Sequence, residues 1–335
     1  MFAVGPSMLI PSTSSLQACI VQLPQLRVIH VTGADAVQFM HSQLTQDIAG
    51  LVRDRAALGG YCTPNGRLLG SGVLWRTGEN GDTVSWLVDA SVADSLIKRL
   101  RMFVLRSRVS LKVADVHVCG IWLDGTSSKA DGLRTHCGAQ LPRATWELLE
   151  TPEATWIVAP RSELQPGPTR WWYISSTVPE SSGAEHRFVQ VWQAFDISAG
   201  LPWVQASTQE ALTPLMANFD LIGGVSFSKG CYPGQEVVAR SYYRSKPKRR
   251  LAWATFPLDG LPAAPETLPG QDVYTTSSDA GPVGRIINAA GVEATGHALF
   301  EVPLSLLDSK LRILAEGPPL QVRALPYPLV SDTAS

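Results

Sequence analysis

This sequence is poor in charged residues for its length and lacks a long apolar run. Charged residues make up 17% of the 335 positions, and the formal net charge is −1. The whole molecule therefore has no strong field that would attract nucleic acid or an anionic membrane, and any electrostatic partner must be met by a local patch. No stretch approaches the ~20 apolar residues of a membrane helix, and residues 1–26 lack the layout of a secretory signal. We expect a cytoplasmic protein with no membrane partner and no nucleic-acid partner.

Cysteines are too few and too scattered for a disulfide framework, and no Cys-x-x-Cys pair is present. No set of four could hold an iron–sulfur cluster, so we expect no stably bound cluster within the chain. His117 and Cys119, with His136 and Cys137, do not have the spacing of a zinc site, so we predict no metal. The five cysteines are Cys19, Cys62, Cys119, Cys137 and Cys231.

Hydrophobic periodicity predicts mixed helices and strands without regular strand–helix alternation. A poorly ordered leader is expected at residues 1–23. Turn residues 63–66 predict a hairpin, and short strands between Gly/Pro turns after residue 250 predict a small β-barrel. Helices are expected at 36–44, 92–101 and 185–199, loops at 124–140 and 161–170, and strands at 26–31, 57–62, 68–75, 85–88, 109–113, 116–122, 146–149, 154–158, 251–256, 273–275, 284–288, 295–302 and 320–324.

One segment carries the chemistry, the octapeptide Lys-Gly-Cys-Tyr-Pro-Gly-Gln-Glu at residues 229–236. Pro233 suits the first position of a helix, which would place Cys231 just before a helix N-terminus. The orphan amides there and the nearby Lys229 both favour a thiolate and predict a lowered pKa for Cys231. Glu236 would sit in the first turn and pair with Lys229 or Arg240. The alternative is an inert, buried thiol.

The octapeptide resembles the signature of the YgfZ family of folate-binding proteins, which help iron–sulfur enzymes and are related to the aminomethyltransferases of glycine cleavage. Other matching segments extend the resemblance over most of residues 26–328. They are residues 31–35, 43–47, 62–67, 196–202, 214–227 and 325–327.

The resemblance implies an α+β fold, an aminomethyltransferase-like ring of α/β subdomains around a central cavity plus a C-terminal β-barrel. The subdomains would span residues 24–115 and 116–245, and the barrel 246–330. A tetrahydrofolate would occupy the central cavity, and iron–sulfur client or assembly proteins would be partners.

The resemblance also assigns roles to individual residues. Cys231 becomes a redox-active or ligand-exchanging thiol with Lys229 and Glu236 beside it. The cofactor-binding residues are predicted to be Trp192, as a platform for the pterin ring, with Tyr232, Gln235 and Arg240. Without the resemblance, Trp192 would be interpreted as core on an amphipathic helix.

Two departures from the family pattern bear on function. A family tryptophan near the first strand corresponds to Leu26, which leaves open a binding module that has lost folate. The aminomethyltransferases carry an acid where this chain has Ser71, in a stretch without Asp or Glu. That departure argues against classical aminomethyl transfer or demethylation, the alternative enzymatic function.

A basic run follows the octapeptide and contains two tyrosines. We interpret it as a solvated linker into the barrel. The alternative is a docking patch for the glutamate tail of folate, RNA or an acidic partner. Its members are Arg240, Tyr242, Tyr243, Arg244, Lys246, Lys248, Arg249 and Arg250.

Overall fold

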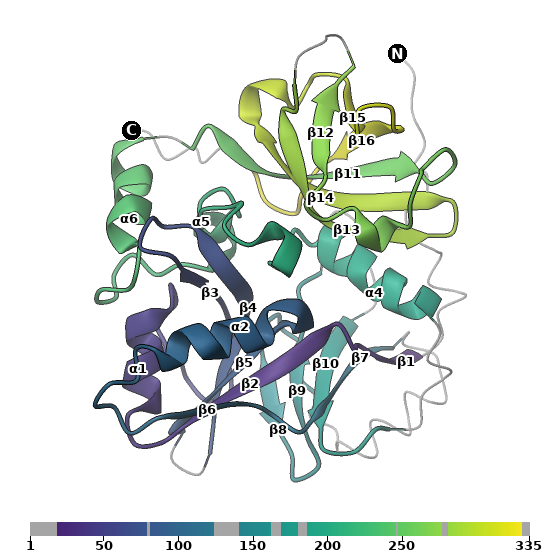
Figure 1. Ribbon diagram of the computed structural model, residues 1–335. Helices are drawn as coiled ribbons and strands as arrows, with labels where there is room; N and C mark the ends of the chain where they lie inside the picture. Colours follow the sequence, from purple (N-terminus) through teal and green to yellow (C-terminus); the bar gives the residue numbers. More distant parts are fainter. Residues whose placement is uncertain are drawn as a thin grey trace.

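The computed structural model describes residues 19–78, 81–123, 141–161, 169–179, 186–245, 247–276 and 281–329. They form two five-stranded antiparallel sheets and a closed six-stranded β-barrel above them (Figure 1). The predicted α+β fold with a C-terminal barrel is confirmed. None of the described helices is long and apolar enough to cross a bilayer.

The first sheet has the order β3 (Ala57–Cys62), β4 (Leu68–Thr77), β5 (Thr83–Asp89), β2 (Leu26–Thr32) and β6 (Ser110–Val113). Helices α1 (Ala36–Gln43) and α2 (Ala90–Arg101) pack on one face of it, against Val31, Leu74 and Trp86 among others. The alternate side chains of its strands face the second sheet, because neighbouring residues of a strand point to opposite faces.

The second sheet has the order β1 (Cys19–Gln22), β7 (His117–Leu123), β10 (Thr169–Ser175), β9 (Ala154–Val158) and β8 (Leu148–Glu150). Period-two alternation is clearest in β10. Trp172 and Ile174 enter the core shared with the first sheet, whereas Trp171 and Tyr173 pack on the opposite face. β10 was not predicted, although its run of aromatic residues is typical of a strand.

The barrel closes in the order β11 (Arg249–Pro257), β14 (Thr295–Pro303), β13 (Gly284–Val292), β12 (Asp272–Thr275), β15 (Leu311–Ile313) and β16 (Pro319–Arg323). Of these strands the sequence analysis missed β15. Helix α4 (His186–Ser198) packs on β13 and β14, between the barrel and the second sheet (Figure 1). Short helices α5 (Phe219–Ile222), η3 (Ala206–Thr208), η4 (Pro265–Thr267) and η5 (Leu304–Leu306) lie in the connections.

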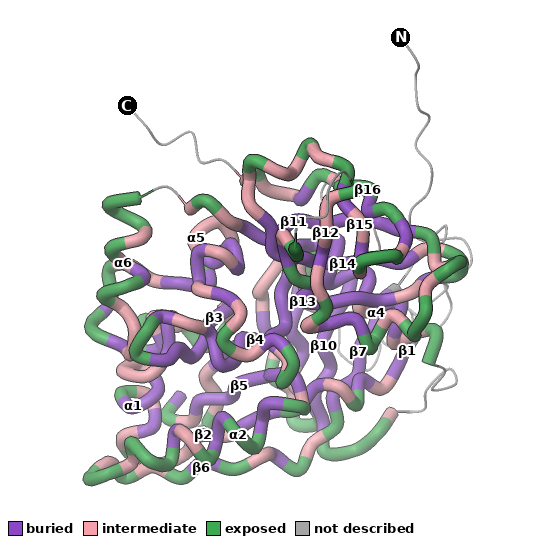
Figure 2. Tube along the Cα trace, turned by 45° about the horizontal axis from the view of Figure 1, so that its top comes forward, coloured by how far each residue is buried: buried purple, intermediate pink, exposed green. Residues whose placement is uncertain are grey.

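One hydrophobic core joins the three parts, since it takes side chains from both sheets, α4 and the barrel. Figure 2 shows the buried positions gathered in the strands, whereas α6 (Gln235–Arg244) is mostly exposed. Val238 is the one fully buried residue of α6. The core therefore fixes the elements around the centre of the molecule firmly and α6 only weakly.

Two local predictions are corrected. Residues 19–22 are not leader, because β1 pairs with residues 119–122 of β7 and completes the second sheet; residues 1–18 lie outside the described residues. By residue type, Asp35 is a typical N-cap for the helix expected from residue 36, but it makes no side-chain cap; its carboxylate instead accepts a hydrogen bond from the Arg108 backbone N–H at 2.7 Å. The predicted division at residues 115 and 245 stays a prediction.

Candidate functional site

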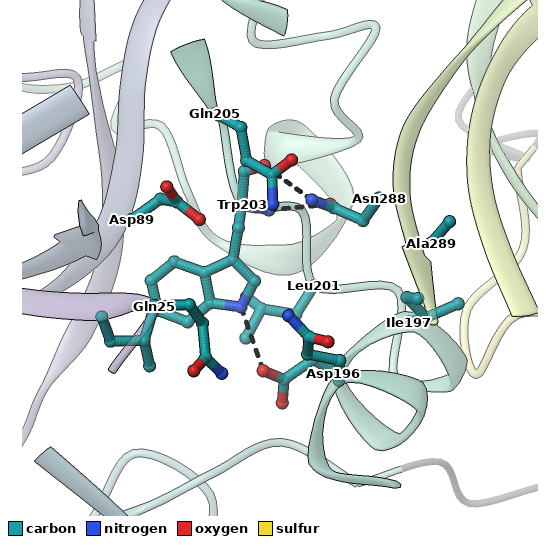
Figure 3. A pocket seen from close by; sticks show the side chains of 11 residues that line it. Gln25, Asp89, Asp196, Ile197, Leu201, Trp203, Gln205, Asn288 and Ala289 are labelled. Atoms are coloured by element: carbon teal, nitrogen blue, oxygen red, sulfur yellow. Dashed lines mark hydrogen bonds between the residues drawn. The ribbon is translucent and has the colours of Figure 1, made fainter. Parts of the chain in front are cut away.

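A pocket lies at the centre of the molecule, where the first sheet, α4 and the barrel converge (Figure 3). The ends of two paired strands form one wall, because Leu26 of β2 lies opposite Asp89 of β5. The chain after α4 and strand β13 form the others. The lining residues are Gln25, Leu26, Asp89, Gln193, Asp196, Ile197, Leu201, Trp203, Gln205, Asn288 and Ala289.

The Trp203 indole is held rigidly in this pocket. Its ring N–H donates to Asp196 Oδ2 at 3.0 Å, its backbone N–H donates to Asn288 Oδ1 at 3.0 Å, and Asn288 Nδ2 donates back to its carbonyl at 2.8 Å. Ser71 fastens the same segment, since its hydroxyl donates to the Pro202 carbonyl and accepts from the Val204 N–H. Ser71 therefore has a structural use that does not depend on folate chemistry.

Asp196 forms a buried ion pair behind Trp203. Its Oδ1 lies 2.8 Å from the Arg170 guanidinium, and the two side chains are only 4% and 1% exposed. Burial raises the pKa of Asp196, while the charge of Arg170 and the hydrogen bond from Trp203 oppose that rise. The pair places a negative charge beside the indole edge.

Asp89 supplies a second carboxylate to the pocket from the end of β5. Its Oδ1 caps α2 by accepting from the backbone N–H of Ser91 at 2.9 Å. Burial raises the pKa of Asp89, and hydrogen bonds from Ser91 and Gln205 oppose the rise. The stretch around Ser71 contains no acid, but the pocket does contain one, because Asp89 reaches it from the neighbouring strand.

Two buried acceptors of the pocket have no hydrogen-bond partner among the described residues, Gln25 Oε1 and Gln193 Oε1. An unpaired buried amide oxygen costs free energy, so a donor is expected to meet it. With Asp89 and Asp196 nearby, the pocket is suited to a flat ring that carries several N–H donors. The pocket is narrow: a water molecule fits between its side chains, and a ring would need them to move.

Lys229 of the octapeptide is buried and caps the end of α1. Its ammonium donates to the carbonyls of His41 and, at 2.7 Å, of Leu44. Burial lowers its pKa to about 8, against the opposing effects of Asp47 and Cys231. These bonds tie the octapeptide to the segment 43–47, where Thr45 also donates to the Gly224 carbonyl at 2.7 Å. These bonds therefore join three segments that resemble the family, residues 43–47, 214–227 and 229–236.

Cys231 is exposed, whereas Cys62 and Cys119 are buried. The helix after it begins later than predicted: α6 starts at Gln235, and Gly234 occupies the N-cap with a φ of 82°. Pro233 is therefore not the first helical residue, and Cys231 lies three residues before the N-cap. Glycine is required at 234 because of this φ and because a Cβ there would lie 2.5 Å from the Thr63 carbonyl.

The remaining octapeptide residues are arranged around α6. Glu236 pairs with Arg240 at 2.7 Å, not with Lys229, and both side chains are largely exposed. Tyr232 is buried, which raises the pKa of its hydroxyl, and the Lys229 ammonium lies 5.0 Å from its ring centre. Gln235 is half-buried at the helix start.

Trp192, the predicted pterin platform, is fully buried in this structure, and its role in binding stays a prediction. The Arg170 guanidinium lies 4.5 Å from its ring centre, and a Cβ at Gly120 would lie 2.4 Å from a ring atom. Trp122 and Trp172 pack around it at 6.2 and 6.0 Å between ring centres. Trp192 is core.

None of the predicted site residues lines the central pocket. The residues that do are Trp203, Asp196, Asp89 and the two glutamines among others, and sequence reasoning did not select them as ligand-binding residues. Two signals were present in the sequence. Leu26, which lines the pocket, holds the place of a family tryptophan, and Asp196 opens the segment 196–202 that resembles the family.

The basic run is less positive than its sequence suggests. Arg249 pairs with Glu301, and Arg250 forms a buried pair with Asp220 at 2.7 Å. Arg244 and Lys248 are exposed, and Lys246 lies outside the described residues. Within the described chain no group of three or more His, Cys, Asp or Glu residues could hold a metal ion; His136 and Cys137 fall in the undescribed segment 124–140.

No protein-family model matches the chain. Curated proteins named tRNA-modifying protein YgfZ are similar over nearly its whole length. The protein from Yersinia enterocolitica is 28% identical over 343 residues, which cover 99% of this chain and 98% of the relative. The protein from Shigella sonnei is 26% identical over 326 residues, 95% of this chain and 96% of the relative.

A solved structure shows the same fold. The glycine cleavage system aminomethyltransferase T from Bartonella henselae superposes with a TM-score of 0.63 at 13% identity, covering 94% of this chain and 86% of that chain. At this identity the likeness concerns the fold alone. The resemblance predicted from the octapeptide is confirmed: the chain is a relative of the YgfZ proteins and has the aminomethyltransferase fold.

Proposed function

We propose that this chain binds tetrahydrofolate in the central pocket and supports iron–sulfur enzymes that modify tRNA, with Cys231 as its functional thiol. The observation that carries the proposal is that the pocket is rich in hydrogen-bond acceptors, with two carboxylates and two unpaired amide oxygens around Trp203. The name of the YgfZ relatives supports the link to tRNA modification.

The pocket residues fit the edge of a pterin. Its 2-amino group and ring N–H are adjacent donors, and Asp89 with Gln25 and Gln193 supplies acceptors for them. Trp203 offers an indole held in place by Asp196, on which a flat ring can stack. Tetrahydrofolate carries one-carbon units when bound; the protein residues orient it and exclude water.

Cys231 would act at the surface by ligand exchange. Its thiol loses its proton to solvent, and its sulfur replaces another ligand on iron held by a client protein. Exposure of the thiol supports this role, and Lys229 supports it by anchoring the preceding backbone to α1.

Two matched substitutions test folate binding by calorimetry on the purified protein. Trp203→Phe, in the pocket, should weaken tetrahydrofolate binding at least tenfold. Trp192→Phe, in the adjacent core, should change it less than twofold. Equal effects, or no binding to the parent protein, would refute the folate proposal.

The thiol is tested separately in a strain that lacks its own copy of this protein. Cys231→Ala should fail to restore the activity of iron–sulfur enzymes, whereas Cys119→Ala, a change at a buried thiol, should restore it. A Cys231→Ala variant as effective as the parent would remove the thiol from the proposal.

Aminomethyl transfer is a second candidate, because Asp89 places a carboxylate in the pocket despite Ser71. Purified protein would then transfer a one-carbon unit from an aminomethyl donor to tetrahydrofolate, and Asp89→Asn would abolish the transfer. Folate binding without transfer favours the accessory role.

A further inference from the structure

A basic surface lies on the first sheet, and none of its residues lines the pocket or belongs to the octapeptide. Residues 94–115 contain six basic and two acidic side chains, although the whole chain has a net charge of −1. The surface combines α2, the loop 102–108 and β6. We call it the α2 patch, which consists of Lys98, Arg101, Met102, Phe103, Leu105, Arg106 and Lys112.

A groove between α2 and β6 forms the basic half of the α2 patch. Lys98, Arg101 and Lys112 line it together with one acid, Asp94. Arg101 crosses from the helix to the strand, where it donates to the Leu111 carbonyl at 2.7 Å. The groove has a volume of about 1060 Å³, part of it open solvent.

The apolar half of the α2 patch is the loop that follows α2. Met102, Phe103 and Leu105 are 70%, 45% and 86% exposed, whereas Val104 between them packs against the core of the first sheet. The Arg108 backbone N–H donates to Asp35 at 2.7 Å and holds the end of the loop. The apolar side chains are thus presented to solvent by an anchored backbone.

Most cations of the α2 patch have no counterion in the part of the chain that the structure describes. Among the described residues, Lys98, Arg106 and Lys112 have no carboxylate within 4.0 Å, and Arg101 is satisfied only by a carbonyl. Such a surface complements an anionic partner.

The mixture of residue types points to a protein partner. Interfaces between proteins have an apolar centre enriched in Met, aromatic residues and Arg within a polar rim, and exposed apolar groups beside one another mark such sites. Phosphates of RNA would neutralise the cations but leave Met102 and Leu105 in water. A second copy of this chain would bring the same positive charges face to face.

We propose that the α2 patch docks a protein partner whose matching surface has an apolar hollow with an acidic rim. The inference rests on the proposed function, in which that partner is the iron–sulfur client. Leu105 and Met102 enter the hollow, and Lys98, Arg101 and Lys112 meet the acidic rim.

Photo-crosslinking in living cells tests the proposal with the full chain. Leu105→p-benzoylphenylalanine is compared with Val322→p-benzoylphenylalanine on the barrel, where Val322 is also exposed. Position 105 should give a discrete protein adduct that position 322 does not give. Lys98→Glu with Lys112→Glu should lower its yield at least tenfold, whereas Arg161→Glu with Lys310→Glu, the same charge change on other exposed residues, should not.

A functional readout separates this surface from the folate site. Met102→Ser with Leu105→Ser should keep the tetrahydrofolate affinity of the parent and lose at least tenfold in restored iron–sulfur enzyme activity. Four outcomes would overturn the proposal. The adduct could survive charge reversal or be removed by ribonuclease. The parent could bind anionic phosphatidylglycerol vesicles in a way that the same reversal abolishes, or the serine variant could restore full activity. If the parent protein does not bind tetrahydrofolate, only the proposed folate site is overturned.

Discussion

The central pocket and the octapeptide are assembled in opposite ways. The pocket takes its residues from strand ends, α4, the following loop and the barrel, between Gln25 and Ala289 in the sequence, and most of them are buried. The octapeptide is eight consecutive residues with an exposed thiol. A contiguous motif identifies relatives, whereas a site built from distant residues becomes visible only once the chain is folded.

The largest expected difference between the two regions concerns their ion pairs. Arg170→Met leaves the buried Asp196 without its counterion, so the free energy of unfolding should fall by about 3–5 kcal/mol. Arg240→Met removes the exposed partner of Glu236 on α6 and should cost about 0.5 kcal/mol or less. Urea unfolding of both variants measures the two losses. Similar losses would mean that Arg170 and Asp196 are not a buried pair.

A pH dependence is expected from Lys229, the buried member of the octapeptide. Its pKa is about 8 in the folded chain against an ordinary value of 10.5. Between these values the unfolded chain holds a proton that the folded chain has lost, so stability rises with pH. From pH 7.5 to 10 the parent should gain on the order of 1–3 kcal/mol relative to Lys229→Met.

Urea unfolding at the two pH values measures this gain. Lys310→Met, at an exposed lysine, serves as control and should follow the parent. If Lys229→Met shows the same pH dependence as the parent, the ammonium is not buried against α1.

In the pocket, Gln193→Leu should change stability and binding in opposite directions. Removing an unpaired buried acceptor should raise the free energy of unfolding by about 1 kcal/mol, while tetrahydrofolate should bind about tenfold more weakly. Gln190→Leu is the matched control on the same helix, because Gln190 accepts a hydrogen bond from the Gly291 N–H and its loss should destabilise. Thermal unfolding and calorimetry report both properties. A destabilised Gln193→Leu would show that the oxygen already has a partner.

The smallest expected effect on stability is at the thiol. Cys231→Ser should change the free energy of unfolding by less than about 0.5 kcal/mol, because the side chain is exposed. In the native parent, iodoacetamide at pH 8 should modify Cys231 and spare Cys62 and Cys119. Burial raises the pKa of those two thiols to about 12 and about 11. Peptide mass spectrometry distinguishes the sites, and labelling of Cys62 at the rate of Cys231 would contradict the assignment.

Much of the local structure followed from the sequence. The hairpin around residues 63–66 and the helices α1, α2 and α4 lie within two residues of their predicted bounds, because turn residues and helical periodicity act over short distances. β10 was missed because it is buried on both faces, so its sequence is a continuous apolar run without apolar–polar alternation, and its start falls in an expected loop. β15 was missed because it is only three residues long. Pro233 was misplaced because Gly234, with its positive φ, takes the N-cap instead.

The binding residues were harder to predict. Trp192 lies on the expected face of α4, yet the side that seemed open to a ligand is filled by Arg170 and the backbone at Gly120. Trp203, three residues beyond the turn at Gly200, has no periodic pattern to mark it. Asp89 lies between an expected strand and an expected helix, and no local pattern marks it as a pocket residue, since its place in the pocket depends on the pairing of β5 with β2.

The sequence by itself determined the relationship to the YgfZ proteins, the barrel after residue 250 and the hairpin that meets the octapeptide, because motifs, turns and alternation are local properties. Tertiary structure alone decided that Trp192 is core, that Lys229 caps α1, and that Asp89, Asp196 and Trp203 share a pocket. The physical reason is burial. Whether a polar or aromatic side chain is available to a ligand depends on what distant segments pack against it, and that packing is a property of the folded chain.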